Sequence, residues 1–313
     1  MEGRTVERIV LGDVEIIRVL EFQGPFAPAA AIVPDLGEPA WAAAAAAADS
    51  DAALAPEHYD PASGAYIGAL QTGVVRSGGR TVLVDTGVGN GRERPATPMF
   101  HRREGRFPEL LAAAGVRPEE VDVVVNTHLH ADHVGWNTTE QDGSWAPTFP
   151  NAQYFLPAAD REFFDPAAGH PARSGGAADP ARWAEWDLVF EDSVAPVLAA
   201  GQAVEWSGSL RIDSALVLEE APGHTPGSSV LRVESGGERA VFVGDLMHSP
   251  VQLAHPSCSS CFCLDPAQAA ASRLRILERA AAERELVIPA HFAGAGAVRV
   301  SRAGAGFAAD WVR

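Results

Sequence analysis

The decisive stretch of the sequence is His128-Leu129-His130-Ala131-Asp132-His133, which places four side chains of metal-binding type within six residues. In an extended segment or a tight turn, His128 and His130 point to the same side, where two imidazoles can meet one ion. Crowding four such groups at the end of a buried strand costs folding free energy unless an ion coordinates them. The stretch therefore predicts a metal site, with a solvated histidine-rich loop as the weaker alternative.

A buried strand at residues 121–126 leads into this motif, and a helix from Pro108 to Ala114, ending at Gly115, precedes it. Strands and helices are predicted in both halves of the chain, with no linker between them. This organisation favours one α/β domain over residues 1–313. The other predicted strands are residues 14–20, 81–85, 203–212, 215–220, 228–233, 240–243 and 286–288, and the other main helices are residues 182–200 and 266–285.

Residues 22–66 differ from the rest of the chain. They hold several prolines, the alanine run 42–48 and few large apolar side chains, among them Phe22, Phe26 and Trp41. The alanines favour a short helix, but the flanking prolines indicate an insertion rather than core. Such an insertion can cover the site as a lid or form the contact of a homodimer.

The charge of the chain limits its partners. Asp and Glu outnumber Lys and Arg by 41 to 24, which gives a net charge of −17. Such a surface repels phosphate backbones and anionic membranes, so we expect a small-molecule substrate, no nucleic acid and no membrane. Acidic residues near the start, where a secretory signal would be positive, and only three cysteines predict a cytoplasmic protein.

Three further residues of ligand type follow predicted strands, among small or turn-forming neighbours. They are His224 in Ala221-Pro222-Gly223-His224-Thr225-Pro226-Gly227, Asp245 in Val241-Phe242-Val243-Gly244-Asp245, and His291 in Ile288-Pro289-Ala290-His291. Each one alone is more often a cap or a surface residue. Together they strengthen the prediction of a metal centre.

The motif and these later residues together resemble the metallo-β-lactamase superfamily over about residues 85–291. The resemblance implies a four-layer αββα sandwich of two similar halves, with the metal centre at one edge between the two sheets. It also implies the ligands: His128, His130 and His224 for the first metal, Asp132, His133 and His291 for the second, and Asp245 bridging both.

Asp85, in Val84-Asp85-Thr86-Gly87, matches an early aspartate of that superfamily. The resemblance implies that Asp85 lies behind the ligands and orients one of them or the motif loop. Capping the turn at Gly87 is the alternative role.

Imidazole and carboxylate ligands without thiolate suit two zinc ions, and they also suit iron, manganese or cobalt. Two such ions bring the pKa of a bridging water toward neutrality, and the resulting hydroxide can attack a carbonyl carbon or a phosphorus atom. The first metal would polarise the substrate oxygen and the second would stabilise the departing alkoxide. Asp132 is the predicted catalytic residue, which orients the water and carries a proton to the leaving group.

The longer string of residues 127–138, followed by residues 147–152, is similar to a bacterial branch with quorum-quenching acyl-homoserine lactonases and methyl parathion hydrolases. It implies hydrolysis of a lactone or another ester, with organophosphate triester hydrolysis as the first alternative. An iron-dependent oxidoreductase of the persulfide dioxygenase type is the second, although such sites use mainly one metal. A non-catalytic relative, a true β-lactamase and an RNA-processing enzyme are less favoured.

The cysteines occur together, as Cys258, Cys261 and Cys263. Their spacing does not fit two ordinary zinc knuckles, so a structural zinc is the weakest interpretation. A thiol that lines the substrate pocket, with Cys258 as the candidate, is better supported, and a chance run of small buried residues better still. His248, close after Asp245, can contact substrate or face solvent.

Overall fold

The computed structural model describes residues 7–46, 57–173 and 179–312. The chain forms two compact units: unit 1 comprises residues 1–21 and 70–214, and unit 2 comprises residues 22–69 and 215–313. The predicted insertion, residues 22–66, therefore belongs to unit 2, and its residues 47–56 lie outside the described part. The single domain and the lid or dimer role of this segment stay predictions.

The first sheet has the strand order β1-β2-β4-β5-β6-β9-β10, and β3 pairs with β4. The neighbours β5, β6, β9 and β10 run parallel. Because the carboxyl ends of parallel strands meet at one edge of a sheet, the residues after β5 and β6 lie side by side there. The strands are β1 (Arg8–Leu11), β2 (Val14–Pro28), β3 (Tyr59–Asp60), β4 (Ala65–Ser77), β5 (Arg80–Val84), β6 (Val123–Val125), β9 (Gln153–Pro157) and β10 (Ala203–Trp206).

Several helices and a small hairpin accompany these strands in unit 1. The hairpin consists of β7 (Thr138–Gln141) and β8 (Ser144–Pro147). The helices are α3 (Phe107–Ala113), α4 (Ala131–Val134), α5 (Ala158–Phe164), α6 (Pro180–Val189) and α7 (Ala195–Ala199), with short 3-10 turns at Pro118–Glu120, Gly135–Asn137 and Pro171–Arg173.

The stretch predicted as helical over residues 182–200 is helical from Pro180 to Ala199, but it is not one α-helix, because a π-helical turn at Phe190–Val194 separates α6 from α7. Pro196 has no N–H to donate to the carbonyl of Asp192, four residues earlier. That carbonyl accepts hydrogen bonds from Arg92 Nη1, at 3.0 Å, and from Thr138 Oγ1, at 2.5 Å. The proline and these two outside donors account for the change of helix type.

The second sheet has the strand order β11-β12-β13-β14-β15-β16-β17. Its strands β14 and β15 run parallel, with Gly244 opposite Pro289, so Asp245 and the nearby His291 follow the same ends of two neighbouring strands. The strands are β11 (Ser209–Arg211), β12 (Leu216–Glu220), β13 (Ser229–Ser235), β14 (Glu238–Gly244), β15 (Leu286–Pro289), β16 (Val298–Ala303) and β17 (Gly306–Trp311).

The strand predicted over residues 203–212 is also wrong as one element. The structure divides it between β10 of the first sheet and β11 of the second. Gly208, between them, has a φ of +70°, a backbone conformation that a continuous strand does not accommodate.

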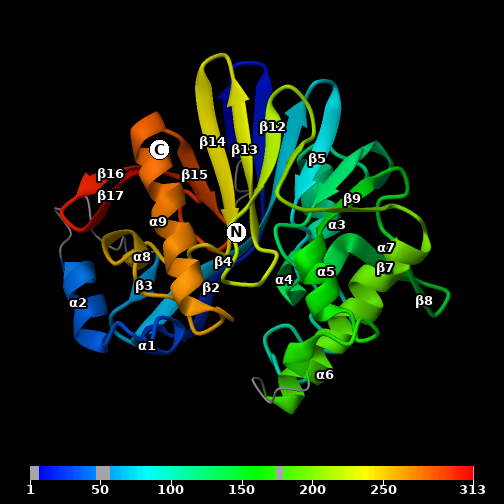
Figure 1. The fold of residues 1–313 in the computed structure, drawn as a ribbon, viewed down its shortest axis with the longest axis horizontal. Helices are drawn as coiled ribbons and strands as arrows, with labels where there is room; N and C mark the ends of the chain where they lie inside the picture. Colours follow the sequence, from blue (N-terminus) through cyan, green and yellow to red (C-terminus); the bar gives the residue numbers. More distant parts are fainter. Residues whose placement is uncertain (1–6, 47–56, 174–178, 313) are drawn as a thin grey trace. The chain divides into compact units, whose positions relative to one another are not determined.

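The helix α9 (Pro266–Glu283) packs on one face of the second sheet (Figure 1). Its buried residues Ile276, Leu277 and Ala280 join a core cluster with Val241 of β14 and Val287 of β15. The Asp265 side chain caps the helix by accepting a hydrogen bond from the Gln268 amide at 2.9 Å, and Pro266 occupies the first turn. These signals fix where α9 begins.

More side chains of residues 22–66 are buried in an apolar cluster than the composition of this segment predicts. Trp41, in α2 (Glu38–Ala46), is fully buried in an apolar cluster of unit 2 together with Tyr59 and Tyr66. The short helix α1 (Ala29–Ile32) contributes Ala29 and Ile32 to the same cluster, and α8 (Val251–Ala254) contributes Val251. The segment is thus anchored by its few large side chains.

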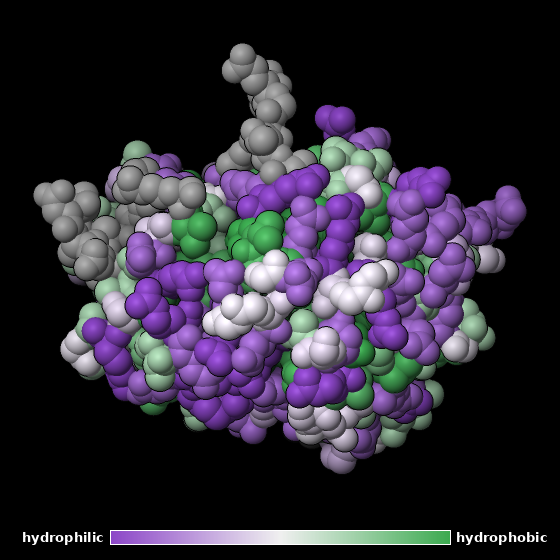
Figure 2. Space-filling view, turned by 90° about the horizontal axis from the view of Figure 1, so that it is seen from above, coloured by the Kyte–Doolittle hydropathy of each residue, from purple (hydrophilic) through white to green (hydrophobic). Residues whose placement is uncertain are grey.

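Within the described ranges, no helix combines the length and the apolar character needed to cross a bilayer. On the face drawn in Figure 2, hydrophilic side chains predominate and the apolar ones form small, separate groups.

Candidate metal centre

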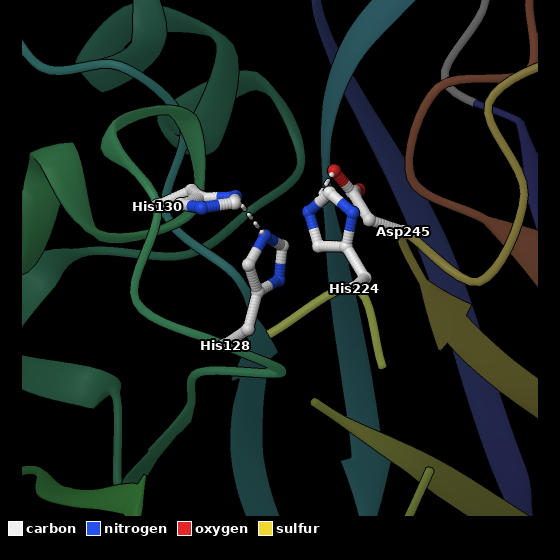
Figure 3. A group of neighbouring side chains, drawn as sticks. All are labelled: His128, His130, His224 and Asp245. Atoms are coloured by element: carbon white, nitrogen blue, oxygen red, sulfur yellow. Dashed lines mark hydrogen bonds and ion pairs between the residues drawn. The ribbon is translucent and has the colours of Figure 1, made fainter. Parts of the chain in front are cut away.

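The motif residues form a cluster at the end of β6, where the chain turns into α4. His128 Nε2 lies 3.1 Å from His130 Nδ1 (Figure 3), and the ring centroids of His128 and His133 are 4.0 Å apart. His133 Nε2 lies 3.7 Å from Asp132 Oδ1. His128 and His133 are buried, and His130 and Asp132 are partly buried. We call these four residues of unit 1 the motif cluster.

The backbone of the motif loop is held by buried polar partners. The amide of Thr86 and the side-chain amide of Asn126 both donate to the carbonyl of His133, at 2.8 and 3.0 Å. The amide of Leu129 donates to Asp160 Oδ2 at 3.0 Å. The Asp160 side chain belongs to α5 and is fully buried. This role of Asp160 could not be predicted from sequence, because an acidic residue in the first turn of a helix ordinarily indicates favourable interaction with the helix N-terminus.

Asp85 connects the end of β5 to the motif cluster. Its carboxylate accepts hydrogen bonds from the Thr127 amide at 2.8 Å and from Thr127 Oγ1 at 2.9 Å, and its Oδ2 lies 2.9 Å from His133 Nδ1. A proton on Nδ1 satisfies this last contact and leaves Nε2 of His133 with its lone pair. Asp85 reaches these partners from a left-handed backbone conformation, with a φ of 58°.

We expect the substitution Asp85→Asn to weaken zinc binding by about 10- to 100-fold, which is the usual effect of losing a partner behind a metal ligand. Asparagine tolerates the left-handed φ, but its NH₂ group cannot accept the hydrogen bonds that the second oxygen accepts. Competition with a chromophoric chelator measures the affinity. The matched control is Asp142→Asn, at an exposed turn with a φ of 51°, which should bind zinc as the unaltered chain does. Equal zinc affinity in both variants would show that Asp85 only stabilises the turn at Gly87.

The second cluster lies in unit 2, around the carboxylate of Asp245. Its Oδ2 lies 3.2 Å from His224 Nε2 and 3.1 Å from His248 Nε2, and its Oδ1 lies 3.0 Å from His291 Nε2. Ligand atoms of Asp245, His248 and His291 all lie within 4.8 Å of one another. Figure 3 shows the His224 ring directed at Asp245. We call these four buried residues the carboxylate cluster.

Neighbouring segments of unit 2 orient the rings of this cluster. His291 Nδ1 lies 2.9 Å from the carbonyl of Ala69, so a proton on Nδ1 leaves Nε2 for Asp245 or a metal ion. The Tyr66 hydroxyl donates to the carbonyl of His291 at 3.1 Å and also contacts the carbonyl of His248. Tyr66 therefore holds the backbone at His248 and at His291 in place.

The surroundings shift the pKa values of two histidines in opposite directions. Burial, the strongest influence, lowers the pKa of His224, but the charge of Asp245 and hydrogen bonds to Asp245 and Cys263 outweigh it and raise that pKa to about 9. Burial, aided by the charges of His224 and His291, lowers the pKa of His248 to about 4, against the pull of Asp245. Metal binding at His224 is therefore expected to release a proton near neutral pH.

Cys258 packs against the apolar cluster around Trp41, and its carbonyl accepts hydrogen bonds from Arg273 Nη1 and Gln252 Nε2, both at 2.9 Å. Its place in a substrate pocket stays a prediction. Cys263 is the cysteine whose thiol contacts a predicted ligand, His224. Among the described residues, the side-chain groups suited to hold an ion contain only His and Asp.

Each unit thus carries a histidine and carboxylate cluster at the ends of parallel strands, which defines a protein of mixed α/β class with side chains suited to divalent metal ions. The family model of the metallo-beta-lactamase superfamily matches residues 68–291. Because this match covers most of the chain, the chain belongs to that superfamily.

Solved structures agree with this assignment. The crystal structure of AbOPH, a hydrolase of the beta-lactamase superfamily, is 22% identical, covers 100% of this chain and 99% of its own, and has a TM-score of 0.79. AidC, a dizinc quorum-quenching lactonase in complex with a product, is 20% identical, with coverages of 98% and 97% and a TM-score of 0.75. At these identities the likeness shows a shared fold, and the predicted fold class is confirmed.

A curated relative has a different activity in its name. Ribonuclease TTHA0252 of Thermus thermophilus is 29% identical in an alignment of 181 residues that covers 54% of this chain and 33% of that protein. The chain spans a third or less of the length of the curated relatives it matches. The expectation that nucleic acid is not a partner therefore stays a prediction.

Proposed function

We propose that this chain is a dinuclear metal-dependent hydrolase that cleaves a lactone or another carboxylic ester. The observation that carries the proposal is that each unit gathers its share of the superfamily's ligand types into one cluster. The seven proposed ligands are His128, His130, Asp132 and His133 of the motif cluster, and His224, Asp245 and His291 of the carboxylate cluster.

The hydrogen bonds behind the ligands support this proposal. Three of the proposed histidine ligands have Nδ1 beside an acceptor of their own unit: His133 beside Asp85, His291 beside the Ala69 carbonyl, and His224 beside Cys263. An acceptor at Nδ1 favours the tautomer whose Nε2 can bind a metal ion. Neutral imidazoles and carboxylates suit zinc, with iron and manganese as alternatives.

In the proposed mechanism, the bound ions, Asp132 and the partners behind the ligands have separate roles. The two ions, when bound, supply a hydroxide at neutral pH and polarise the scissile carbonyl. Asp132, partly exposed beside His133, orients the attacking water through its carboxylate and carries the released proton to the leaving oxygen. Asp85 and the Ala69 carbonyl hold His133 and His291 in place while the substrate reacts.

The choice of ester rests on the similarity of residues 127–138 and 147–152 to the lactonase branch. A net charge of −17 disfavours long polyanions as substrates. Organophosphate triesters carry no charge and are the first alternative. The ribonuclease name of the curated relative favours RNA as a second candidate substrate. Cytoplasmic location and a homodimer also stay predictions.

A substrate panel with defined metals tests the proposal. The protein is stripped with a chelator, reloaded with zinc, manganese or iron, and assayed with lactones, aryl esters, a phosphotriester, a thioester and an RNA oligonucleotide. We expect chelation to abolish hydrolysis of lactones or esters and zinc to restore it, with two ions bound per chain. Cleavage of RNA alone, or one iron per chain with oxygen uptake, would overturn the proposal.

The matched pair His133→Ala and His255→Ala controls for general damage to the protein. His133 is a buried proposed ligand, and His255 is an exposed histidine. The first variant should lose zinc and activity, whereas the second should keep both. Equal behaviour of the two variants would contradict the proposed ligand set.

A further inference from the structure

Both ring nitrogens of His224 have a partner within unit 2. Nε2 lies 3.2 Å from Asp245 Oδ2, and Nδ1 lies 3.8 Å from the sulfur of Cys263, a hydrogen-bond distance for sulfur. The ring thus stands between a carboxylate on the side proposed to face the metals and a thiol on the other side. Cys263 is half-buried, and its sulfur also lies 3.5 Å from Ser260 Oγ.

Backbone hydrogen bonds fix the thiol relative to the ring. The amide of Leu264 donates to the carbonyl of His224 at 3.0 Å, and the amide of Asp265 donates to the carbonyl of Gly223 at 2.9 Å. Asp265 is also the residue that caps α9. The position of Cys263 therefore follows from the pairing of two chain segments and not from the side-chain rotamer alone.

The segment of His224 is further held against the start of α9. Gly223 has a φ of +130°, and a Cβ there would lie 2.1 Å from the backbone nitrogen of Ala269. Ser272 Oγ donates to the carbonyl of Pro222 at 2.7 Å. Because the two residues before His224 are held against α9, the ring has little freedom to move away from Cys263.

We propose that Cys263 is a positioning residue for His224, whose sulfur accepts a hydrogen bond from Nδ1–H and so presents Nε2 to a metal ion. A neutral imidazole carries one proton, and an acceptor beside Nδ1 decides which nitrogen keeps the lone pair. The usual acceptors are carboxylates, backbone carbonyls and water. Here the carboxylate of Asp85 lies beside His133 Nδ1 and the carbonyl of Ala69 lies beside His291 Nδ1. A sulfur occupies the corresponding place beside His224 Nδ1.

The inference rests on the proposed function, since it assigns a residue behind one of the proposed ligands. Cys263→Ala removes the acceptor, Cys263→Asp replaces it with a carboxylate, and Cys261→Ala changes an exposed neighbour as the control. We expect Cys263→Ala to weaken zinc binding by about 10- to 100-fold. Cys263→Asp should restore the original affinity or exceed it, and Cys261→Ala should leave it unchanged.

Chelator competition on the stripped full-length variants gives the zinc affinities, and cobalt substitution shows which atoms bind the metal. A cobalt spectrum without an intense sulfur-to-metal band supports an indirect role. Such a band, present in the unaltered chain and lost in Cys263→Ala, would mean that the thiol itself is a ligand and would overturn the inference.

Unchanged zinc affinity in Cys263→Ala would also overturn the inference while leaving the proposed function intact. If that variant does not fold, Cys263→Asp decides: retained affinity supports the positioning role, and weakened affinity in a folded protein refutes it. An unaltered chain that binds no zinc would refute the proposed function, and the inference with it.

Discussion

The substitution Asp132→Asn is expected to lower kcat for the preferred ester by about 10²- to 10⁴-fold, the range typical of losing a positioned acid or base. Asparagine keeps the shape of the side chain and its place beside His133, where Asp132 Oδ1 lies 3.7 Å from Nε2. An amide, however, neither takes up nor releases a proton near neutral pH. The step that depends on a proton at Asp132 should therefore slow, while substrate binding changes little.

Steady-state kinetics and metal content measured together separate the two proposed roles of Asp132. A loss of kcat with both zinc ions retained indicates proton transfer, whereas loss of one zinc ion indicates that ligation dominates. Asp142→Asn, in the exposed turn between β7 and β8, is the control and should keep full activity. Activity of Asp132→Asn within threefold of the original would contradict any catalytic role.

A second large effect is expected in stability, at a buried group of charges in unit 1. Asp192 Oδ1 lies 3.2 Å from Arg92 Nη1 and 2.8 Å from Arg94 Nη2, and its Oδ2 lies 2.8 Å from Arg94 Nη1. Both arginines are almost fully buried. Burial, the strongest influence, lowers the pKa of Arg92 to about 10 despite the charge of Asp192. The carboxylate thus compensates two buried cations.

We expect Asp192→Ala to lower the free energy of unfolding by about 3–5 kcal/mol, because removing one partner leaves buried charge uncompensated. Urea unfolding followed by circular dichroism measures the change. Glu120→Ala is the control, because its pair with Arg117 is exposed, and its unfolding midpoint should not move. A loss below about 1 kcal/mol in Asp192→Ala would show that other groups compensate the arginines.

The same group of charges also contacts the segment that follows the motif cluster. Arg92 Nη2 donates to the carbonyl of Gly135 at 2.5 Å and to Thr138 Oγ1 at 2.8 Å, just after the motif cluster. A buried arginine therefore ties the chain beyond His133 to the π-helical turn at Phe190–Val194. We expect Asp192→Ala to loosen this tie and to weaken zinc binding in the same titration.

The sequence predicted what depends on local pattern. The apolar run before His128 predicts β6, and the spacing of His128 and His130 predicts that two imidazoles approach each other, as they do. The helix predicted from residue 266 onward begins at Pro266 in α9, as the pattern indicates. Each of these features depends on residues close together in the chain, so one window of sequence contains the whole signal.

What could not be predicted depends on contacts between distant segments. Nothing near Arg92 indicates that its partners are Asp192 and Thr138, which are about 100 and 46 residues away. The strand β4 was missed because Gly68 and Gly73 interrupt its apolar pattern. Gly68 lies against the ring of Phe26, and a Cβ there would come within 2.9 Å of it. A larger residue at Gly68 would thus have to displace the Phe26 ring, although the glycine weakens the strand signal.

The close approach of Gly223 to Ala269 offers a way to sort related sequences. A homologue with any other residue at this position must have moved the start of its helix, because the space for a single carbon atom is taken by backbone. A mutant library at position 223, selected for activity, should return glycine alone. A related sequence that keeps the histidine but lacks this glycine is then expected to place the start of its helix differently. Such sequences should be separated from the others before substrate preferences are inferred across the family.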